Sequence, residues 1–313
     1  MGQIVTLTFS PCIDKSTSVA KLAPDIKMNC SLPIFEPGGG GINVARAMHK
    51  LGGTAIAMYV SGGYTGKRFD QLLADEKILA SVIPGMMETR ENIIIVDESN
   101  QKQYRFGMPM SPLTRHEWHQ FLTRLEEMEQ LKYIIVSGSL PPDVPLSVYS
   151  DISAIAKQKK ARLIVDTKGD ALKNAVDAGV FLIKPNLGEL SALLGIKNQL
   201  LTHEIKDVAR TIINTGNCEV IVVSMGAEGA MLVTSTYAKQ IKPPMVERKS
   251  TVGAGDSMVA GIVFSLFNQS SLTEAIQYGV ACGTAATLNP GTELCQKADV
   301  EKLLKNVEIQ DLD

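Results

Sequence analysis

The stretch Val220-Ile221-Val222-Val223, followed by the turn residues Ser224-Met225-Gly226, sets the fold class. Four β-branched residues in succession predict a strand that is buried on both faces, as in a parallel sheet covered by helices. Similar runs alternate with segments of helical period, at Ile134-Ile135-Val136, Leu163-Ile164-Val165 and Phe181-Leu182-Ile183. The sequence therefore predicts an α/β fold with a mostly parallel central sheet covered by helices on both faces.

Polar residues stand shortly after three of these runs, namely Asp166, Asn186 and Ser224. In an open α/β sheet, ligands bind beyond the carboxyl ends of the strands, where the connecting loops leave a crevice. These three residues therefore mark the predicted edge of a ligand site.

Two early regions break the alternation of strands and helices. Residues 13–35 show no helical period and contain Pro24 and Pro33, whereas residues 88–107 hold two β-rich stretches around a turn at 97–101. The second region is typical of a hairpin. We expect a single domain over residues 1–313, in which about 13–36 and 88–107 build a small β-sheet that serves as a lid or as a dimer surface.

Composition excludes several classes of partner. The chain has 31 Lys and Arg against 33 Asp and Glu, so no net field draws it to nucleic acid or to an anionic membrane. Its five cysteines are widely spaced without a CxxC pair, which argues against a disulfide framework or a zinc site and favours a reducing cytoplasm. We find no secretory signal and no run of about 18 apolar residues that could span a bilayer. Small molecules are the expected partners.

A glycine-rich turn runs into an apolar helical segment at Ser250-Thr251-Val252-Gly253-Ala254-Gly255-Asp256-Ser257. Gly253 and Gly255 allow backbone N–H groups to approach an anion at the positive end of a helix dipole. Asp256 would be repelled by that anion, so its presence suggests a base that takes the proton from an attacking sugar hydroxyl. The alternative is that Asp256 caps the helix.

A second glycine cluster, Gly38-Gly39-Gly40-Gly41, precedes an amphipathic helix that has Asn43 in its first turn. The glycines let the backbone lie against a ligand, and Asn43 offers a donor and an acceptor to a polyol. Tight packing of the glycines is the alternative. The chain has neither the P-loop pattern nor a dinucleotide-binding fingerprint in its first βα turn, so we expect neither a P-loop enzyme nor a dehydrogenase.

In order and spacing, residues 38–43, 186–189 and 251–256 resemble the signatures of the ribokinase-like (PfkB-type) sugar kinases. The resemblance covers essentially the whole chain and implies a ribokinase-like fold and ATP-dependent phosphorylation of a sugar. Residues 35–43, 137–142 and 250–258 are most similar to members that act on fructose 6-phosphate. Members acting on fructose 1-phosphate or tagatose 6-phosphate usually carry a lysine where this chain has Gly40, and these acceptors stay as alternatives.

The resemblance implies roles for the glycine-rich turn and for one further motif. Asp256 is the expected base for the sugar 1-hydroxyl. The backbone of Gly253, Ala254 and Gly255 is the expected anion hole for the charge on the transferring phosphoryl group. Asn186 and Glu189, one helical turn apart, are expected to hold Mg²⁺ near the ATP phosphates. The alternative for Glu189 is a first-turn carboxylate that stabilises its helix.

The resemblance also implies two sets of ligand contacts. The expected contacts to the sugar phosphate are Asp14, Gly38, Gly39, Gly40, Gly41, Asn43 and Ser139, with Arg90, Lys27 and Arg105 on the 6-phosphate. The expected contacts to the nucleotide are Lys184, Asn186, Ser224, Gly226, Gly229, Thr251, Gly253, Gly255 and Asn289.

Some family members hold a monovalent cation beside the anion hole. The matching positions for K⁺ are Ser250, Val252, Ala286, Asn289 and Gly291. Glu293 is a possible further ligand, although the resemblance leads us to expect a basic residue at that position. A homodimer through the lid is also expected. A non-catalytic sensor of sugar phosphate or nucleotide is the alternative of a different class, although a sensor needs no base at Asp256.

Overall fold

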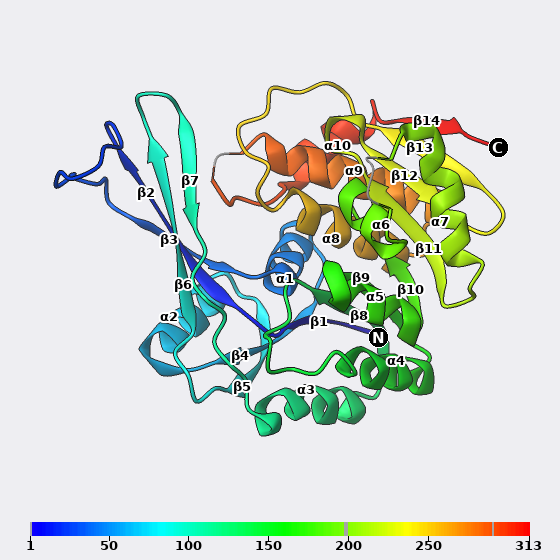
Figure 1. Ribbon diagram of the computed structural model, residues 1–313, viewed down its shortest axis with the longest axis horizontal. Coiled ribbons are helices and arrows are strands. Elements are labelled where there is room, and N and C mark those ends of the chain that lie inside the picture. The colour runs from blue at the N-terminus through cyan, green and yellow to red at the C-terminus, as the bar shows by residue number, and fades with distance from the viewer. Residues whose placement is uncertain (1, 197–199, 290) are drawn as a thin grey trace.

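The computed structural model describes residues 2–196, 200–289 and 291–313, and its main body is built on a large sheet (Figure 1). The strands of this main sheet are β1 (Gln3–Thr8), β4 (Ile56–Ser61), β5 (Leu79–Pro84), β8 (Leu131–Ser137), β9 (Arg162–Asp166), β10 (Val180–Ile183), β11 (Cys218–Ser224), β12 (Ala230–Val233), β13 (Ala238–Lys242) and β14 (Glu308–Asp311). The ten strands lie in the order β14-β13-β12-β11-β10-β9-β8-β1-β4-β5. All neighbours from β11 to β5 pair in parallel, and β12, β13 and β14 add an antiparallel edge, which confirms the predicted mostly parallel sheet.

The apolar runs that predicted the fold lie in β8, β9, β10 and β11, at the centre of the main sheet. Along β8, Ile134 and Val136 are buried against one layer of helices, while Ile135 is buried against the other. In β11, Val222 and Val223 divide between the two layers in the same way. The strands are apolar at consecutive positions because both faces of the main sheet are covered.

Helices form a layer on each face of the main sheet. One layer contains α1 (Gly40–Lys50), α2 (Gly63–Asp75), α8 (Ala254–Phe267), α9 (Leu272–Thr287) and α10 (Lys297–Leu304). The other contains α3 (Arg115–Glu127), α4 (Val148–Lys159), α5 (Gly169–Ala178), α6 (Leu187–Leu193) and α7 (Ile205–Ile213). Short 3₁₀ turns lie at Thr202–Glu204 and Gly226–Glu228. No helix in the described ranges is long and apolar enough to cross a membrane.

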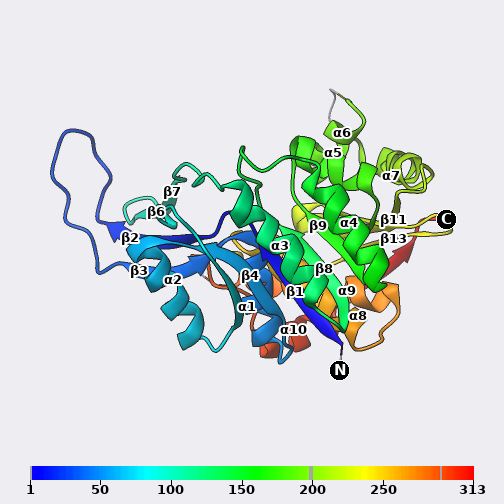
Figure 2. The same ribbon diagram turned by 90° about the horizontal axis from the view of Figure 1, so that it is seen from below.

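A second, four-stranded sheet stands off the main body, and we call it the lid sheet (Figures 1 and 2). Its strands are β2 (Cys12–Val19), β3 (Ile34–Gly38), β6 (Arg90–Asp97) and β7 (Lys102–Phe106), in the order β3-β2-β6-β7. The hairpin predicted from residues 88–107 is β6 and β7, and the predicted lid ranges agree with the strands to within a few residues. Strands β2 and β6 pair in parallel although many residues separate them along the chain.

Candidate active site

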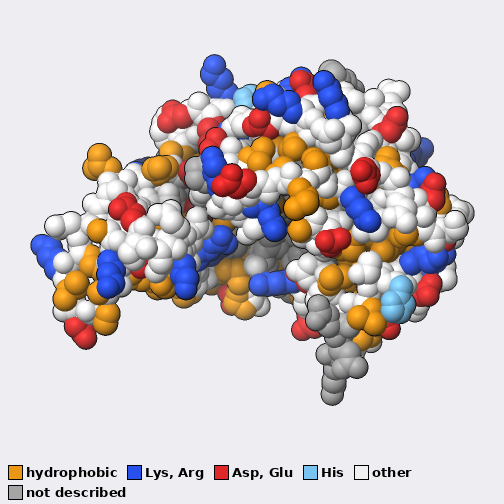
Figure 3. All heavy atoms as spheres, turned by 90° about the horizontal axis from the view of Figure 1, so that it is seen from above, with side chains coloured by type: hydrophobic (Ala, Val, Ile, Leu, Met, Phe, Trp, Pro, Cys, Tyr) orange, Lys and Arg blue, Asp and Glu red, His pale blue; other side chains and the backbone are white. Residues whose placement is uncertain are grey.

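The candidate site lies where the central strands of the main sheet end. Ser137 and Asp166 are the last residues of β8 and β9, and Asn186 pairs with Ser224 in an isolated parallel bridge just past β10 and β11. Figure 3 shows a hollow between the lid and the main body, bordered by Lys and Arg side chains. The carboxyl-end position predicted for the ligand site is therefore the position of the cleft.

The glycine-rich turn places the start of α8 at this cleft. Gly253 precedes the helix with a φ of 73°, in the left-handed region that favours glycine. The N–H groups of Ala254, Gly255 and Asp256 have no partner within the helix and lie at the positive end of its dipole. A Cβ at Gly255 would lie 3.3 Å from the Nζ of Lys184, so this glycine leaves room for the ammonium group. The turn thus offers an anion both backbone donors and a nearby cation.

Asp256 lies in the first turn of α8 but does not cap it. The N-cap residue is Gly253, and no side chain caps the helix. Instead, one carboxylate oxygen of Asp256 accepts from Nδ2 of Asn43 at 2.9 Å, and the other accepts from Oγ of Ser137 at 3.4 Å. The capping alternative is therefore excluded, and the carboxylate is held in the cleft by residues from α1 and β8.

The surroundings of Asp256 make it a stronger base than an ordinary carboxylate. Burial and the nearby carboxylate of Asp166 raise the pKa of Asp256 to about 7, against the opposing effects of Asn43, Lys184 and Ser137. At neutral pH, a carboxyl group with a pKa near 7 is partly ionised, and its ionised form takes up a proton more readily than an ordinary carboxylate does. This pKa suits proton abstraction from a hydroxyl.

Lys184 lies beneath the turn and carries the charge that balances the carboxylates. It is buried, and its Nζ lies 3.2 Å from Oδ1 of Asp166. Burial lowers the pKa of Lys184, but the carboxylates of Asp166, Asp256 and Glu189 outweigh burial and leave that pKa raised. The side chain therefore stays positively charged at the floor of the cleft.

One cavity of about 380 Å³ lies between the lid sheet and the start of α1, with Val252 of the glycine-rich turn on its wall, and we call it the sugar-side cavity. It is lined by most of the predicted sugar contacts, namely Asp14, Gly39, Gly40, Asn43, Arg90, Arg105 and Ser139. Gly38 and Gly41 do not line it, because they pack against neighbours that leave no room for a side chain: the Asp14 carboxylate at Gly38, and Thr8 and Leu7 at Gly41. The tight-packing alternative thus holds for these two glycines.

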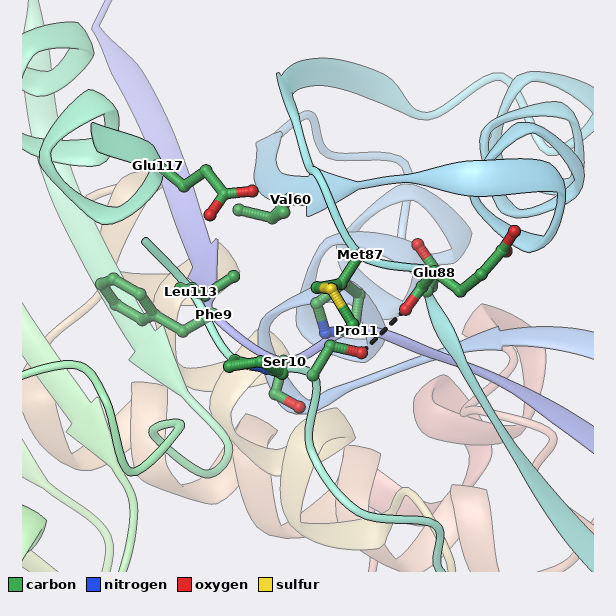
Figure 4. Close-up of a pocket in the computed structure, with 11 residues that line it drawn as sticks. Phe9, Ser10, Pro11, Val60, Met87, Glu88, Leu113 and Glu117 are labelled. Atoms are coloured by element: carbon green, nitrogen blue, oxygen red, sulfur yellow. Dashed lines mark hydrogen bonds between the residues drawn. The ribbon is translucent and has the colours of Figure 1, made fainter. Parts of the chain in front are cut away.

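Arg90 is oriented by Ser10, which lies in the loop between β1 and β2. Its Nε donates to Oγ of Ser10 at 3.0 Å, and its Nη2 donates to the Ser10 carbonyl at 3.3 Å. Behind Ser10, Figure 4 shows Glu88 and Glu117 near a small cavity of about 20 Å³. The Glu88 carbonyl there accepts from Oγ of Ser111 at 2.7 Å, which ties the segment before β6 to the returning chain. The two hydrogen bonds to Ser10 fix the orientation of the Arg90 guanidinium.

A second cavity, of about 540 Å³, lies on the other side of the start of α8, and we call it the nucleotide-side cavity. The predicted nucleotide contacts that line it are Asn186, Ser224, Gly226, Gly229, Thr251 and Gly255. The sequence did not identify its apolar wall, which includes Pro243, Pro244, Met245, Val246 and Val280. Such a wall suits the flat face of a nucleobase.

Besides Gly38 and Gly41, four predicted contacts lie outside these two cavities. Lys27 is exposed in the long loop between β2 and β3 (Figure 2), so the structure does not bring it to Arg90 of the same chain. Lys184 lies under the turn, and Gly253 lies within the turn just before α8; neither lines a cavity wall. Nδ2 of Asn289 donates to the Leu294 carbonyl at 3.1 Å.

The two residues predicted to hold Mg²⁺ form a reciprocal cap at the start of α6. The Asn186 side chain accepts from the Glu189 N–H at 2.9 Å, and the Glu189 carboxylate accepts from the Asn186 N–H at 2.9 Å. The helix-stabilising alternative for Glu189 is therefore present in the structure. Within the described ranges, no three His, Cys, Asp or Glu residues cluster as a metal site.

The residues predicted to hold K⁺ do converge next to the turn. Oγ of Ser250 donates to the Gly291 carbonyl at 2.6 Å and accepts from the Val252 N–H at 3.2 Å. The Asn289 N–H donates to the Ala286 carbonyl at 3.3 Å. These contacts make a loop rich in backbone carbonyls beside the start of α8.

Three polar residues of the site were not predicted as contacts. Ser137 donates to Asp256, Ser10 anchors Arg90, and Asn92 lines the sugar-side cavity beside Asp14. Ser137 lies in the 137–142 motif, so its position was a usable signal. Nothing in the local sequence marks Asn92, because its neighbours come from a strand far away along the chain.

Comparison with known proteins agrees with this geometry. Residues 8–299 match the family model described as pfkB family carbohydrate kinase. The chain is 42% identical over 306 residues to ATP-dependent 6-phosphofructokinase isozyme 2 of Escherichia coli (strain K12), covering 97% of this chain and 98% of that protein. The solved Escherichia coli phosphofructokinase-2 in complex with potassium has a TM-score of 0.93 at 41% identity, covering 98% of this chain and 99% of that one. Its complex with fructose-6-phosphate has a TM-score of 0.91 at 40% identity, with the same coverage. The chain therefore belongs to the pfkB family of carbohydrate kinases.

Proposed function

We propose that this chain is an ATP-dependent 6-phosphofructokinase, which phosphorylates the 1-hydroxyl of fructose 6-phosphate. The observation that carries the proposal is the position of Asp256, a base with a raised pKa. Its carboxylate is bonded to Asn43 and Ser137, which line the sugar-side cavity, and the preceding residue, Gly255, lines the nucleotide-side cavity. The name of the Escherichia coli relative and that protein's complex with fructose-6-phosphate support the same acceptor.

In the proposed reaction, Asp256 takes the proton of the 1-hydroxyl as that oxygen attacks the γ-phosphorus of ATP. One O–P bond forms to the sugar while the bond to the ADP oxygen breaks, and the proton passes from Asp256 to solvent. The N–H groups of Gly253, Ala254 and Gly255, with the charge of Lys184, stabilise negative charge on the transferring group. No covalent intermediate with the protein is needed, since positioning and charge stabilisation supply the catalysis.

The sugar-side cavity supplies groups suited to both ends of a sugar phosphate. Asp14, Asn43 and the backbone at Gly39 would bind hydroxyls, with Ser139 as a further hydroxyl contact. Arg90 and Arg105 would hold the 6-phosphate, because a guanidinium fork matches two phosphate oxygens.

Of the residues proposed to hold metal ions, Asn186 lines the nucleotide-side cavity. Mg²⁺ bound with ATP would neutralise phosphate charge, and Asn186 and Glu189 would hold it and its waters. The fit is supported by the Glu189 carboxylate, which is near enough to Lys184 to help raise the pKa of that side chain. The carbonyl-rich loop would hold K⁺ through Ser250, Val252, Ala286, Asn289 and Gly291.

Gly40 favours fructose 6-phosphate over the alternative acceptors. A Cβ at Gly40 would lie 2.6 Å from the Gly138 N–H nitrogen and would also collide with Ser137. A lysine, as in members acting on fructose 1-phosphate or tagatose 6-phosphate, therefore fits here only if the end of β8 moves. In this chain, where position 40 has no lysine, Arg90 is the candidate partner of the 6-phosphate.

The test of the proposed function is ADP release with Mg²⁺-ATP and a set of acceptors. We expect strong turnover with fructose 6-phosphate and weak or no turnover with tagatose 6-phosphate, fructose 1-phosphate and unphosphorylated sugars. Preference for another acceptor would keep the mechanism and overturn the substrate. Binding without turnover of any acceptor would favour the sensor alternative.

The raised pKa of Asp256 predicts a pH profile. The base acts only when deprotonated, so kcat should rise about tenfold per pH unit below about pH 7 and level off above it. The measurement is kcat at saturating substrates from mildly acidic to mildly alkaline pH. A flat profile down to the ordinary pKa range of aspartate would contradict the assignment.

A Glu189→Gln variant separates metal binding from helix capping. Glutamine keeps a side-chain oxygen for the Asn186 N–H, so we expect the melting temperature to stay close to wild type. The lost charge should raise the Mg²⁺ concentration for half-maximal activity by about tenfold. A large fall in melting temperature with unchanged Mg²⁺ dependence would leave Glu189 a capping residue alone.

We further propose that the chain works as one kinase domain that dimerises through the lid sheet. Exposed apolar side chains gather on and around this sheet, with Leu32 93%, Ile34 64% and Phe106 46% exposed. Such side chains are candidates for burial against a second copy.

A further inference from the structure

Four side chains on one face of the lid sheet form a compact polar group. Strands β2 and β6 pair in parallel, with Cys12 opposite Arg90 and Asp14 opposite Asn92. All four line the sugar-side cavity. The register of these two strands therefore places Asn92 directly between a carboxylate and a guanidinium.

The amide of Asn92 bonds both charged groups through opposite ends. Its Nδ2 donates to Oδ1 of Asp14 at 2.9 Å and to Sγ of Cys12 at 3.2 Å. Its Oδ1 accepts from Nη1 of Arg90 at 3.2 Å and from the Met108 N–H at 3.1 Å. A flipped amide would set donors against the guanidinium and the Met108 N–H and its oxygen against the carboxylate, so Asp14, Arg90 and Met108 fix the orientation.

A neutral amide at this point keeps two opposite charges apart. Asp14 and Arg90 are diagonal neighbours on adjacent strands, within reach of each other's long side chains. The ion pairs found in the described ranges do not include one between them. Because each charge is bonded to Asn92 instead, each keeps capacity for a ligand in the cavity.

We propose that Asn92 is a positioning residue that sets the spacing of Asp14 and Arg90 and thereby selects phosphorylated sugars. The inference rests on the proposed function, in which Asp14 binds sugar hydroxyls and Arg90 binds the 6-phosphate. Met108 belongs to the same hydrogen-bonded group, since Nη1 of Arg90 also donates to the Met108 carbonyl at 3.2 Å. Asn92 thus joins the hydroxyl anchor, the phosphate anchor and the chain leaving β7.

Two substitutions at Asn92 act in different ways. Asn92→Ala removes the spacer, so Asp14 and Arg90 are free to pair with each other instead of with the ligand. Asn92→Asp keeps the shape but places a carboxylate beside Asp14 and against Arg90, where it repels the incoming phosphate. Protonation of that carboxyl group restores an O–H donor toward Asp14, so the defect of this variant should ease as the pH falls.

The titratable and charged groups near the new carboxyl are few. Asp14 and Cys12 face it from β2, Arg90 from its own strand, and Arg105 borders the cavity from β7. Burial and Asp14 raise the pKa of the Cys12 thiol to about 12, so the thiol stays neutral in the range tested. The pH response therefore reports the pair of carboxyl groups.

The experiment compares steady-state kinetics of wild type, both Asn92 variants and Asn100→Ala, with fructose 6-phosphate and Mg²⁺-ATP varied in turn. Asn100 is a matched control, because it also bridges lid residues, bonding Asp97 and Lys102, but lies in the turn between β6 and β7. We expect both Asn92 variants to raise the KM for fructose 6-phosphate by about 20-fold at about pH 8, with the KM for ATP within about twofold. In Asn92→Asp, the ratio of sugar KM to the wild-type value should fall toward about pH 6.

Several outcomes would overturn the inference. A sugar KM within about threefold of wild type in both Asn92 variants would remove the positioning role. Equal rises in both KM values, with a lower melting temperature and no pH response, would reduce Asn92 to a structural residue. If the wild-type protein prefers another ketose phosphate, only the proposed substrate is wrong, and the same comparison of variants is made with that acceptor. If the wild-type protein phosphorylates none of the acceptors, both the proposed function and the role of Asn92 are wrong.

Discussion

Replacing Asp256 with asparagine is expected to lower kcat by about 10³-fold or more while leaving the affinity for fructose 6-phosphate near that of wild type. Asparagine has the same shape, but its amide cannot take the proton of the 1-hydroxyl. It also has one acceptor oxygen, so it keeps only one of the contacts from Asn43 and Ser137. The measurements are single-turnover rates for the chemical step and calorimetric titration for sugar-phosphate binding.

The same variant should be more stable than wild type at alkaline pH. The pKa of Asp256 is about 7 in the folded chain against an ordinary 3.8, so the folded state binds the proton more tightly than the unfolded state. This group therefore lowers the free energy of unfolding as the pH rises from about 4 to about 7. Removing the ionisable group should add about 1 to 3 kcal/mol at about pH 8 and little at about pH 4.

Asp151→Asn is the matched control, since Asp151 also lies in the first turn of a helix but is exposed on α4. It should change the free energy of unfolding by no more than about 0.5 kcal/mol and leave kcat unchanged. An Asp256→Asn variant that is less stable than wild type at alkaline pH would contradict the raised pKa. One that keeps wild-type kcat would remove Asp256 from the mechanism.

The central sheet could be predicted because burial on both faces leaves a local signal. Each of β8 to β11 shows consecutive apolar residues, and the turn residue that follows marks where the strand ends. The start of α8 was predictable for a related reason, because a turn that needs a positive φ and close approach at Gly253 and Gly255 requires glycine in the sequence. These features depend on residues that are adjacent along the chain.

The rest of the site depends on contacts between distant segments. Asn92 reaches Asp14 only through the register of β2 and β6, and no pattern in either strand states that register. The role expected for Lys27 depended on a loop whose course the sequence does not fix. Figure 2 shows this loop, between β2 and β3, extending away from the main body, and Lys27 does not line the sugar-side cavity. Lys184 was expected on the nucleotide wall, but its pairing with Asp166 sets it beneath the turn.

That ion pair gives the second large expected effect. Lys184→Met should lower the free energy of unfolding by about 3 kcal/mol, because it leaves the partly buried Asp166 carboxylate without its counter-charge and beside Asp256. Urea denaturation at neutral pH measures the change. Lys239→Met is the control, since Lys239 pairs with Asp311, whose side chain is 74% exposed, and loss of such a surface pair should cost less than about 1 kcal/mol.

The double variant Asp166→Asn with Lys184→Met tests whether the charge of Lys184 also acts in catalysis. It removes both charges of the pair, so most of the lost stability should return. The rate should not return with it, because the cation beside the anion-binding turn is still missing, and we expect kcat to stay about 10²-fold below wild type. Recovery of both stability and kcat would make the pair purely structural.

The pH profile of the double variant gives an independent test of the electrostatics. The effect of Asp166 in raising the pKa of Asp256 is larger than the opposing effect of Lys184. Removing both charges should therefore lower the pKa of Asp256, so the rise of kcat shifts to lower pH than in wild type. Lys184→Met alone removes only the opposing charge and should shift the rise to higher pH. Shifts in opposite directions from variants that both lack Lys184 would show that Asp166 adds to the effect of burial in raising the pKa of Asp256, because a general loss of structure would move both profiles the same way.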